Sequence, residues 1–257
     1  METTNVINQI GNTPLIKLKQ VSDLTQCNIY GKAEYFNPGE SVKDRAALFI
    51  VEDAIKRGLI NKGGTIVEGT AGNTGIGLAV VCKEYDLNLK IVIPNTQSIE
   101  KKETLRKLGA ELIEVDAVPY SNPKNYIKQS KQIAEDLNKK SKNGVYWANQ
   151  FDNVINTEAH IKTTAEEIWN QTAGSVDGFT CAVGTGGTLA GVSIGLKNKN
   201  KNVKIALSDP MGSSLFSHIK NNKLESSGSS ITEGIGTGRI TKNFEKALVD
   251  DAFQTND

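Results

Sequence analysis

Apolar runs of strand length alternate with helix-like patterns along most of the 257-residue chain. Short apolar runs, often β-branched, predict strands at residues 65–68, 89–94, 111–115, 144–148, 179–183 and 203–208. Apolar positions that recur every three or four residues predict helices at 46–57, 76–85, 99–108, 123–141, 158–172 and 189–197. This alternation indicates right-handed βαβ units, in which helices cover both faces of a parallel sheet.

The same rhythm occurs in both halves of the chain, and the polar, irregular segment 148–158 is the predicted crossing point between them. We therefore expect an α/β fold that is two-lobed and three-layered (αβα), with mostly parallel sheets. The predicted small lobe is approximately 43–152, and the large lobe combines 1–42 with 153–257. Both belong to one predicted domain that spans 8–257.

Charge and cysteine content narrow the possible partners and compartment. The 30 basic and 29 acidic residues nearly cancel, which disfavours nucleic acid and anionic membranes as partners because binding many phosphates needs a basic excess. The three cysteines form no C-x-x-C pair, as is typical of a reducing compartment. Residues 1–8 are polar, and no segment approaches the roughly 20 apolar residues that span a bilayer. We expect a cytoplasmic protein, without a metal site because no His/Cys/Asp cluster has ligand spacing.

Two glycine-rich loops follow predicted strands and open predicted helices, at Glu68–Gly75 and Gly184–Thr188. Ligands bind beyond the carboxyl ends of parallel strands, and the free N–H groups of a helix start attract anions. The second loop has no lysine of the nucleotide-hydrolase type, and Leu189 stands where a dinucleotide fingerprint needs its third glycine. It therefore predicts a cradle for the phosphate of a smaller ligand. The first loop, taken alone, is better explained as a βα turn that needs glycine.

Lys43 is the candidate nucleophile. Ser41 and Asp44 match the [ST]-x-x-[DE] pattern of a helix start, and Gly58 follows the predicted helix as its stop. A lysine in the first turn faces the positive end of the helix dipole, which lowers its pKa and favours the neutral amine. A neutral amine is what a Schiff base with an aldehyde cofactor requires, while the alternative is an ordinary surface lysine.

Six short motifs occur in one order along the chain: Ile10–Leu15, Asn37–Arg45, Gly69–Gly75, Asn149–Asn153, Gly184–Thr188 and Glu233–Gly236. Together they resemble the cysteine synthase (O-acetylserine sulfhydrylase) and cystathionine β-synthase family. The resemblance implies pyridoxal 5'-phosphate (PLP) as cofactor and the tryptophan-synthase-β-like fold, which is PLP fold type II. It also implies that a C-terminal part of the fold is missing after Asp257, including the Ser/Thr that bonds the pyridine nitrogen in the family.

The resemblance also implies a role for each matching residue. Lys43 would be catalytic and hold the cofactor as a Schiff base. The other implied cofactor-binding residues are Asn73 at the ring oxygen and Gly184, Thr185, Gly186, Gly187 and Thr188 at the phosphate. The implied substrate-binding residues are Thr70, Ala71, Gly72, Thr74 and Gln150 at the carboxylate, with Gly234 beside the bound amino acid.

The implied reaction is a β-replacement in which O-acetylserine and sulfide give L-cysteine through an aminoacrylate intermediate, catalysed by a homodimer. Cystathionine β-synthase or another β-replacing enzyme is the in-class alternative. The alternative of another class is a catalytically impaired binding or partner protein derived by C-terminal truncation.

Overall fold

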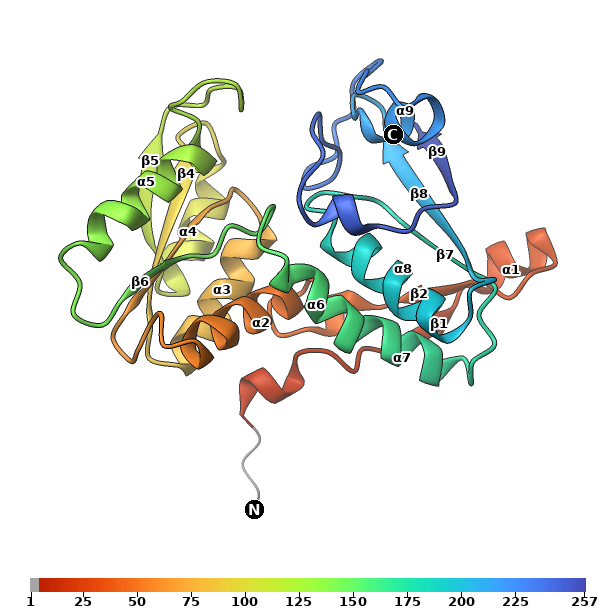
Figure 1. The fold of residues 1–257 in the computed structure, drawn as a ribbon, viewed down its shortest axis with the longest axis horizontal. Helices are drawn as coiled ribbons and strands as arrows, with labels where there is room; N and C mark the ends of the chain where they lie inside the picture. The colour runs from red at the N-terminus through yellow and green to blue at the C-terminus, as the bar shows by residue number, and fades with distance from the viewer. Residues whose placement is uncertain (1–4) are drawn as a thin grey trace.

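The computed structural model describes residues 5–257 and contains two parallel sheets near opposite ends of the long axis of the molecule (Figure 1). The first sheet has the strand order β5-β4-β3-β6, and the second has the order β7-β8-β9. A separate antiparallel pair joins β1 to β2. The strands are β1 (Leu15–Lys17), β2 (Tyr30–Lys32), β3 (Thr65–Gly69), β4 (Asn88–Pro94), β5 (Glu111–Val115), β6 (Val145–Trp147), β7 (Gly178–Cys181), β8 (Lys204–Pro210) and β9 (Asp251–Thr255).

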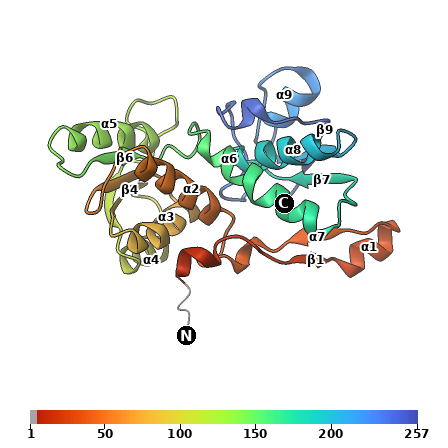
Figure 2. The same cartoon turned by 60° about the horizontal axis from the view of Figure 1, so that its bottom comes forward.

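Helices lie beside both sheets and between them (Figures 1 and 2). The α-helices are α1 (Lys19–Thr25), α2 (Lys43–Lys56), α3 (Asn73–Glu84), α4 (Ile99–Lys107), α5 (Tyr126–Asn138), α6 (Ile155–Lys162), α7 (Thr164–Gln171), α8 (Gly187–Lys199) and α9 (Leu215–Asn221). Three short 3₁₀ helices are η1 (Val6–Gln9), η2 (Glu34–Phe36) and η3 (Phe244–Lys246).

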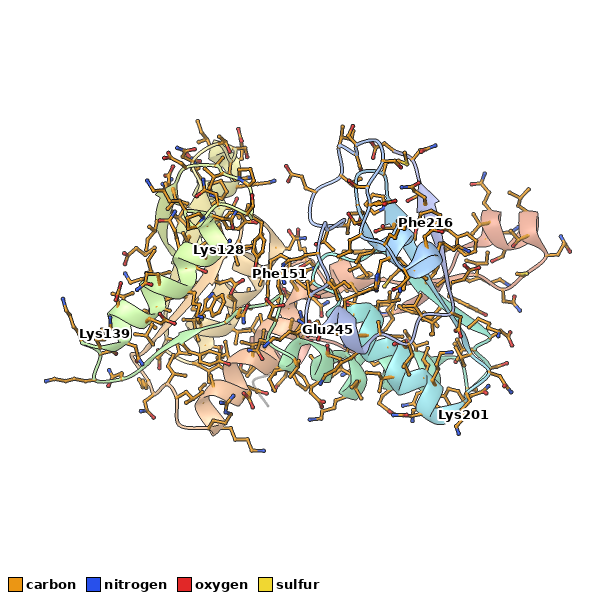
Figure 3. All side chains as sticks on the ribbon, turned by 45° about the horizontal axis from the view of Figure 1, so that its top comes forward. Lys128, Lys139, Phe151, Lys201, Phe216 and Glu245 are labelled. Atoms are coloured by element: carbon orange, nitrogen blue, oxygen red, sulfur yellow. The ribbon has the colours of Figure 1, made fainter. Side chains whose placement is uncertain are left out.

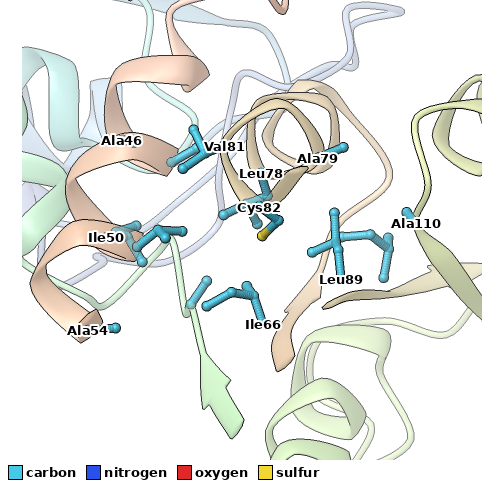
Figure 4. Packing of buried hydrophobic residues seen from close by; sticks show 14 of the residues in the cluster. Ala46, Ile50, Ala54, Ile66, Leu78, Ala79, Val81, Cys82, Leu89 and Ala110 are labelled. Carbon is cyan, nitrogen blue, oxygen red and sulfur yellow. The ribbon is translucent and has the colours of Figure 1, made fainter. Parts of the chain in front are cut away.

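The first sheet is apolar on both faces, as a sheet in the middle of three layers must be. Alternate residues of a strand point to opposite faces. Ile66 of β3 accordingly packs in a cluster with Leu78 of α3 and Ile50 of α2 (Figure 4), whereas its neighbour Val67 packs in a second cluster with Ala134 of α5. Helices α2 and α3 therefore cover one face of this sheet, and α5 covers the other.

The second sheet has its own apolar core. Ile205 and Leu207 of β8 belong to one buried cluster with Leu189 and Leu196 of α8 and with Leu215 of α9. Helix α2 contacts α3 beside the first sheet and also α6, and α6 in turn packs on α8 beside the second sheet. The first residue of α2 is therefore held where the two groups of elements meet.

All predicted strands are present, with ends shifted by at most two residues, but four predicted helices need correction. The helix predicted at 76–85 begins three residues earlier, at Asn73. The helix predicted at 158–172 is two helices, α6 and α7, which meet at Thr163, whose φ of −121° and ψ of −73° interrupt the helical path. The helix predicted at 123–141 begins only at Tyr126, because the Asn125 side chain accepts from the Ile127 N–H and caps it there.

The helix predicted at 46–57 begins at Lys43, and its N-cap is Val42, which makes no side-chain capping bond. The predicted Ser41–Asp44 capping box is therefore wrong. Ser41 Oγ accepts from the Lys43 N–H at 3.3 Å, while the Asp44 carboxylate accepts from the N–H of Gly39 in the preceding turn.

The lobe boundaries at 42/43 and 152/153 stay predictions, and residues 1–4 of the predicted large lobe lie outside the described part of the chain. Within residues 5–257, no helix combines the length and apolar character needed to cross a membrane. The same residues contain no group of three or more His, Cys, Asp or Glu side chains arranged to hold a metal ion.

Candidate active site

Lys43 is partly buried, and its amine lies near the strand that leads into the Gly184–Thr188 loop. Burial lowers the pKa of Lys43, and the thiol of Cys181, at the end of β7, lies near enough to oppose that effect. The lowered pKa agrees with the sequence analysis, but its main cause is burial rather than the helix dipole. A lowered pKa increases the share of the neutral amine, which is the form that acts as a nucleophile or a proton acceptor.

Buried ion pairs fix the helix turn that carries Lys43. Arg45, which is 1% exposed, donates to both carboxylate oxygens of Glu34 and to both of Glu167. Burial opposes the charge of Arg45, yet the bonds to Glu167 and Glu34 outweigh it and raise the pKa of this guanidinium. Burial likewise opposes the charge of Glu167, but its bonds from Arg45 and Lys32 lower its pKa to about 2. These groups therefore stay charged and paired.

The loop Gly184–Thr188 joins β7 to the start of α8, as the sequence predicts for a phosphate cradle. Gly186 is the N-cap of α8 and has φ 88°, a left-handed conformation that favours glycine. A Cβ on Gly187 would lie 2.1 Å from Asn156 Oδ1, and one on Gly184 would lie 2.3 Å from the Gly234 carbonyl oxygen. The loop therefore packs so closely on its surroundings that glycine is required at each of these positions.

The other glycine-rich loop, Glu68–Gly75, opens α3 beyond the carboxyl end of β3. Gly72 is the N-cap of α3 and Asn73 its first residue. Thr74 Oγ1 donates to Gln150 Oε1 at 2.5 Å, and both side chains are buried. The structure thus joins the predicted carboxylate-binding loop directly to Gln150. Figure 3 shows the next residue, Phe151, between the two groups of elements.

The predicted site residues meet through a few contacts. Gly234 lies against Gly184, and the Gly236 N–H, two residues on, donates to the Val183 carbonyl at 2.7 Å. Gln150 and Thr185 share one neighbour, the side-chain amide of Asn156. For Ala71 and Asn73 the structure gives the position at the start of α3, with Asn73 exposed, and their roles stay predictions.

Three polar residues at the site were not predicted from the sequence. Asn156 joins the Gln150 and Thr185 segments, and Asn243 Nδ2 donates to the Gln150 carbonyl at 2.9 Å. His160 Nε2 lies 3.2 Å from Thr188 Oγ1, and its Nδ1 lies 2.8 Å from Thr164 Oγ1. Burial, followed by the positive charge of Arg45, lowers the pKa of His160 to about 3, so its imidazole is neutral. The signal that could have found Asn156 is the polarity of 148–158, which the sequence analysis assigned only to a lobe crossing.

These residues fit an aldehyde cofactor with a phosphate group. Lys43 offers an amine of lowered pKa near Cys181. The loop that begins three residues after Cys181 offers N–H groups at the start of α8. The hydroxyl of Thr185 lies in the same loop and is buried. The fold and the site thus define an α/β enzyme of the PLP type.

Comparisons with known proteins agree with this class. A family described as "Pyridoxal-phosphate dependent enzyme" matches residues 6–255, and the chain belongs to this family. It is 55% identical over 253 residues to cysteine synthase 1 of Neurospora crassa, across 96% of this chain but 66% of that protein. The chain therefore spans about two thirds of the length of that relative.

Two solved structures are similar over the whole chain. A hydrogen sulfide-producing enzyme of Fusobacterium nucleatum is 38% identical, with a TM-score of 0.83, and the match covers 100% of this chain and 80% of that one. An O-acetylserine dependent cystathionine beta-synthase of Helicobacter pylori is 33% identical, with a TM-score of 0.84 and the same coverage of 100% and 80%.

Proposed function

We propose that the protein binds PLP and forms L-cysteine from O-acetylserine and sulfide by β-replacement. The observation that carries the proposal is the position of Lys43 at the start of α2, where desolvation lowers its pKa and its amine lies near Cys181, at the end of the strand that leads into the Gly184–Thr188 loop. The 55% identity to a protein named cysteine synthase 1 supports the choice of reaction.

Each group of residues has a part in this proposal. Gly184–Thr188 would bind the cofactor phosphate, and Asn73 would bind the ring oxygen. Bound PLP supplies an electron sink for the negative charge that remains when the substrate loses its Cα proton. Lys43 Nζ, as a neutral amine, would bind the cofactor aldehyde, accept the Cα proton after the substrate amine displaces it, and later return a proton to Cα.

The loop Thr70–Thr74 and Gln150 would hold the substrate carboxylate. Because Thr74 donates to Gln150 Oε1, the amide nitrogen is the donor end of the Gln150 side chain, and the start of α3 adds backbone N–H groups. Acetate would leave Cβ, and hydrosulfide would add at the same carbon, so the products are L-cysteine and acetate. Gly234 would lie beside the bound amino acid.

The experiment is a product assay on the purified protein loaded with PLP, with O-acetylserine and sulfide as substrates. We expect equal amounts of cysteine and acetate, with Lys43→Ala lowering the rate by several orders of magnitude. Cystathionine formed from homocysteine in place of sulfide would assign the protein to the cystathionine β-synthase alternative, which the similarity to the Helicobacter pylori protein supports. Absence of both products with PLP bound would contradict the proposal.

We also propose that the protein is a cytoplasmic homodimer with lobes at 43–152 and at 1–42 plus 153–257. Exposed apolar side chains on the N-terminal segment support self-association, since such patches often mark interfaces. Leu24 is 82% exposed, Tyr35 61% and Phe36 58%. Light scattering on the purified protein tests the dimer, and cell fractionation tests the compartment.

A further inference from the structure

The Thr185 hydroxyl has one close side-chain partner, the buried amide of Asn156. Asn156 belongs to α6 and is 1% exposed. Its Nδ2 donates to the Gln150 carbonyl oxygen at 2.9 Å and lies 3.0 Å from Thr185 Oγ1. One amide group thus touches both the segment proposed to bind the substrate carboxylate and the loop proposed to bind phosphate.

The contact with Gln150 settles which way the Asn156 amide is turned. A backbone carbonyl oxygen can only accept a hydrogen bond, so the Asn156 atom beside it must be the nitrogen. The same nitrogen faces Thr185 Oγ1 and can only donate. The Thr185 hydroxyl must therefore accept from Asn156, and its own proton is not used in this bond.

The Thr185 hydroxyl proton has no protein acceptor among residues 5–257. The remaining bond at Thr185 Oγ1 comes from the Gly187 N–H, at 3.5 Å, and is again one that the hydroxyl accepts. A threonine hydroxyl has one proton to donate and two lone pairs to accept with. With both lone pairs facing donors, the proton is directed away from Asn156 and Gly187.

Contacts that do not involve the Thr185 hydroxyl fix the rest of the loop. Thr241 Oγ1 donates to the Thr185 carbonyl at 2.7 Å, which holds the loop backbone. Gly187 packs on the Asn156 amide so closely that a Cβ there would lie 2.1 Å from Oδ1. The amide of Asn156 is therefore wedged between the loop and Gln150 and has no room to turn over.

We propose that Asn156 is a positioning residue that directs the Thr185 hydroxyl proton towards a phosphate bound in the Gly184–Thr188 loop. A phosphate dianion offers only acceptor oxygens, so a hydroxyl whose lone pairs already face donors is set to donate to it. Hydrogen bonds to a charged acceptor are about twice as strong as neutral ones. Through the Gln150 carbonyl, the same amide also fixes the segment proposed to hold the substrate carboxylate.

The inference rests on the proposed cofactor site, and equilibrium binding of PLP and of inorganic phosphate to the cofactor-free protein tests it. Asn156→Asp keeps the shape of the side chain but replaces the donor with acceptors, so the Thr185 proton turns to Asp and away from the ligand. We expect the dissociation constants for PLP and phosphate to rise about 10- to 100-fold, as for loss of a bond to a charged group.

The matched control is Thr157→Val, the next residue of α6, which is 2% exposed and donates to Asn243 Oδ1 at 2.8 Å. This variant removes a buried hydrogen bond without touching Thr185 and should change either dissociation constant less than about 3-fold. Equal losses in Asn156→Asp and Thr157→Val, or unchanged PLP binding by folded Asn156→Asp, would overturn the inference.

Thr185→Val and Thr185→Ser keep the test decisive if Asn156→Asp does not fold. The valine variant should bind PLP as weakly as predicted for Asn156→Asp, and the serine variant, which keeps the hydroxyl, should bind nearly as well as the unchanged protein. Equal binding by the valine and serine variants would contradict the role of the hydroxyl proton. Binding is measured without turnover, so its outcome does not depend on the reaction. A protein that binds PLP but forms no cysteine would contradict the proposed function and leave this inference standing.

Discussion

Arg45 and Glu167 form a buried, two-bond ion pair, with Nη1···Oε1 at 2.6 Å and Nη2···Oε2 at 2.8 Å. The pair connects α2 to α7, and the bonds from Arg45 to Glu34 connect α2 to η2. Since Arg45 stands two residues after Lys43, this network fixes the helix turn that aims the Lys43 amine. Arg45 itself is only 1% exposed, so water cannot readily replace a partner that its guanidinium loses.

Removing the guanidinium should therefore destabilise the protein strongly. Arg45→Met leaves Glu34 and Glu167 without their main cation, and loss of one partner from a buried ion pair costs about 3–5 kcal/mol. We expect the midpoint of thermal unfolding to fall by roughly 10 °C. The control is Arg57→Met at the C-cap of the same helix, whose pair with Asp53 is exposed and should contribute little. Similar midpoints for the two variants would show that the network does not hold α2.

Glu68 should make stability fall as the pH rises. The residue is 1% exposed, its Oε2 has no hydrogen-bond partner among residues 5–257, and burial raises its pKa from 4.5 to about 8. Between these values the folded state holds a proton that the unfolded state releases, so the stabilisation present below pH 4.5 is lost progressively towards about pH 8.

Glu68→Gln removes this titration and should gain stability relative to the unchanged protein as the pH rises. Urea unfolding at several values from pH 5 to pH 8 provides the measurement. Glu135→Gln, at the exposed Lys131–Glu135 pair of α5, is the matched control and should run parallel to the unchanged protein. If the stability of Glu68→Gln also changed with pH in parallel with that of the unchanged protein, Glu68 would be ionised in the folded protein throughout this range.

Two glycines of the chain should respond very differently to alanine. A Cβ on Gly187 would meet Asn156 Oδ1 at 2.1 Å, whereas one on Gly238 would meet no atom within 4 Å. Gly187→Ala should displace the Asn156 amide, cost about 1–3 kcal/mol as overpacked sites do, and weaken PLP binding. Gly238→Ala should leave the unfolding midpoint and PLP binding unchanged. Calorimetry and PLP titration of both variants check this, and tight PLP binding by Gly187→Ala would argue against a fixed Asn156.

The strands and helices that pack against a sheet could be predicted from the sequence, because buried faces impose a period on the apolar residues. Ile66 and Val67 show the signal clearly, since each enters a different apolar cluster. The break between α6 and α7 carries no such signal. Thr163 continues the polar pattern of a helix and interrupts it only through its backbone angles, which reflect tertiary packing.

The N-terminal strands and the last strand were not predicted, for a similar reason. β1 and β2 are three residues each and only partly buried, so they show too few positions for an alternating pattern. In β9, Ala252 is buried while Phe253 is exposed, which is the reverse of what residue size suggests. Pairing with β8 determines this strand, and pairing is not visible in the sequence.

Some of the site residues could be predicted from the sequence, and others could not. Glycine-rich loops and Lys43 were predicted because each stands at the junction of a strand or turn with a helix. Asn156 and His160 were not, because an asparagine or a histidine inside a helix has no local signal for the loop it will contact. Their contacts with Thr185 and Thr188 arise only when α6 packs against the start of α8.

The most direct test of the whole account is to find which lysine holds the cofactor. Borohydride reduction of the PLP-loaded protein, followed by digestion and mass spectrometry, fixes the cofactor covalently to that residue. We predict a single phosphopyridoxyl group on Lys43, which is lost in Lys43→Ala. The control is Lys56→Ala, at the exposed end of the same helix, which should leave the label unchanged. A label on another lysine, or one spread over the surface lysines with Lys43 unmodified, would contradict the account.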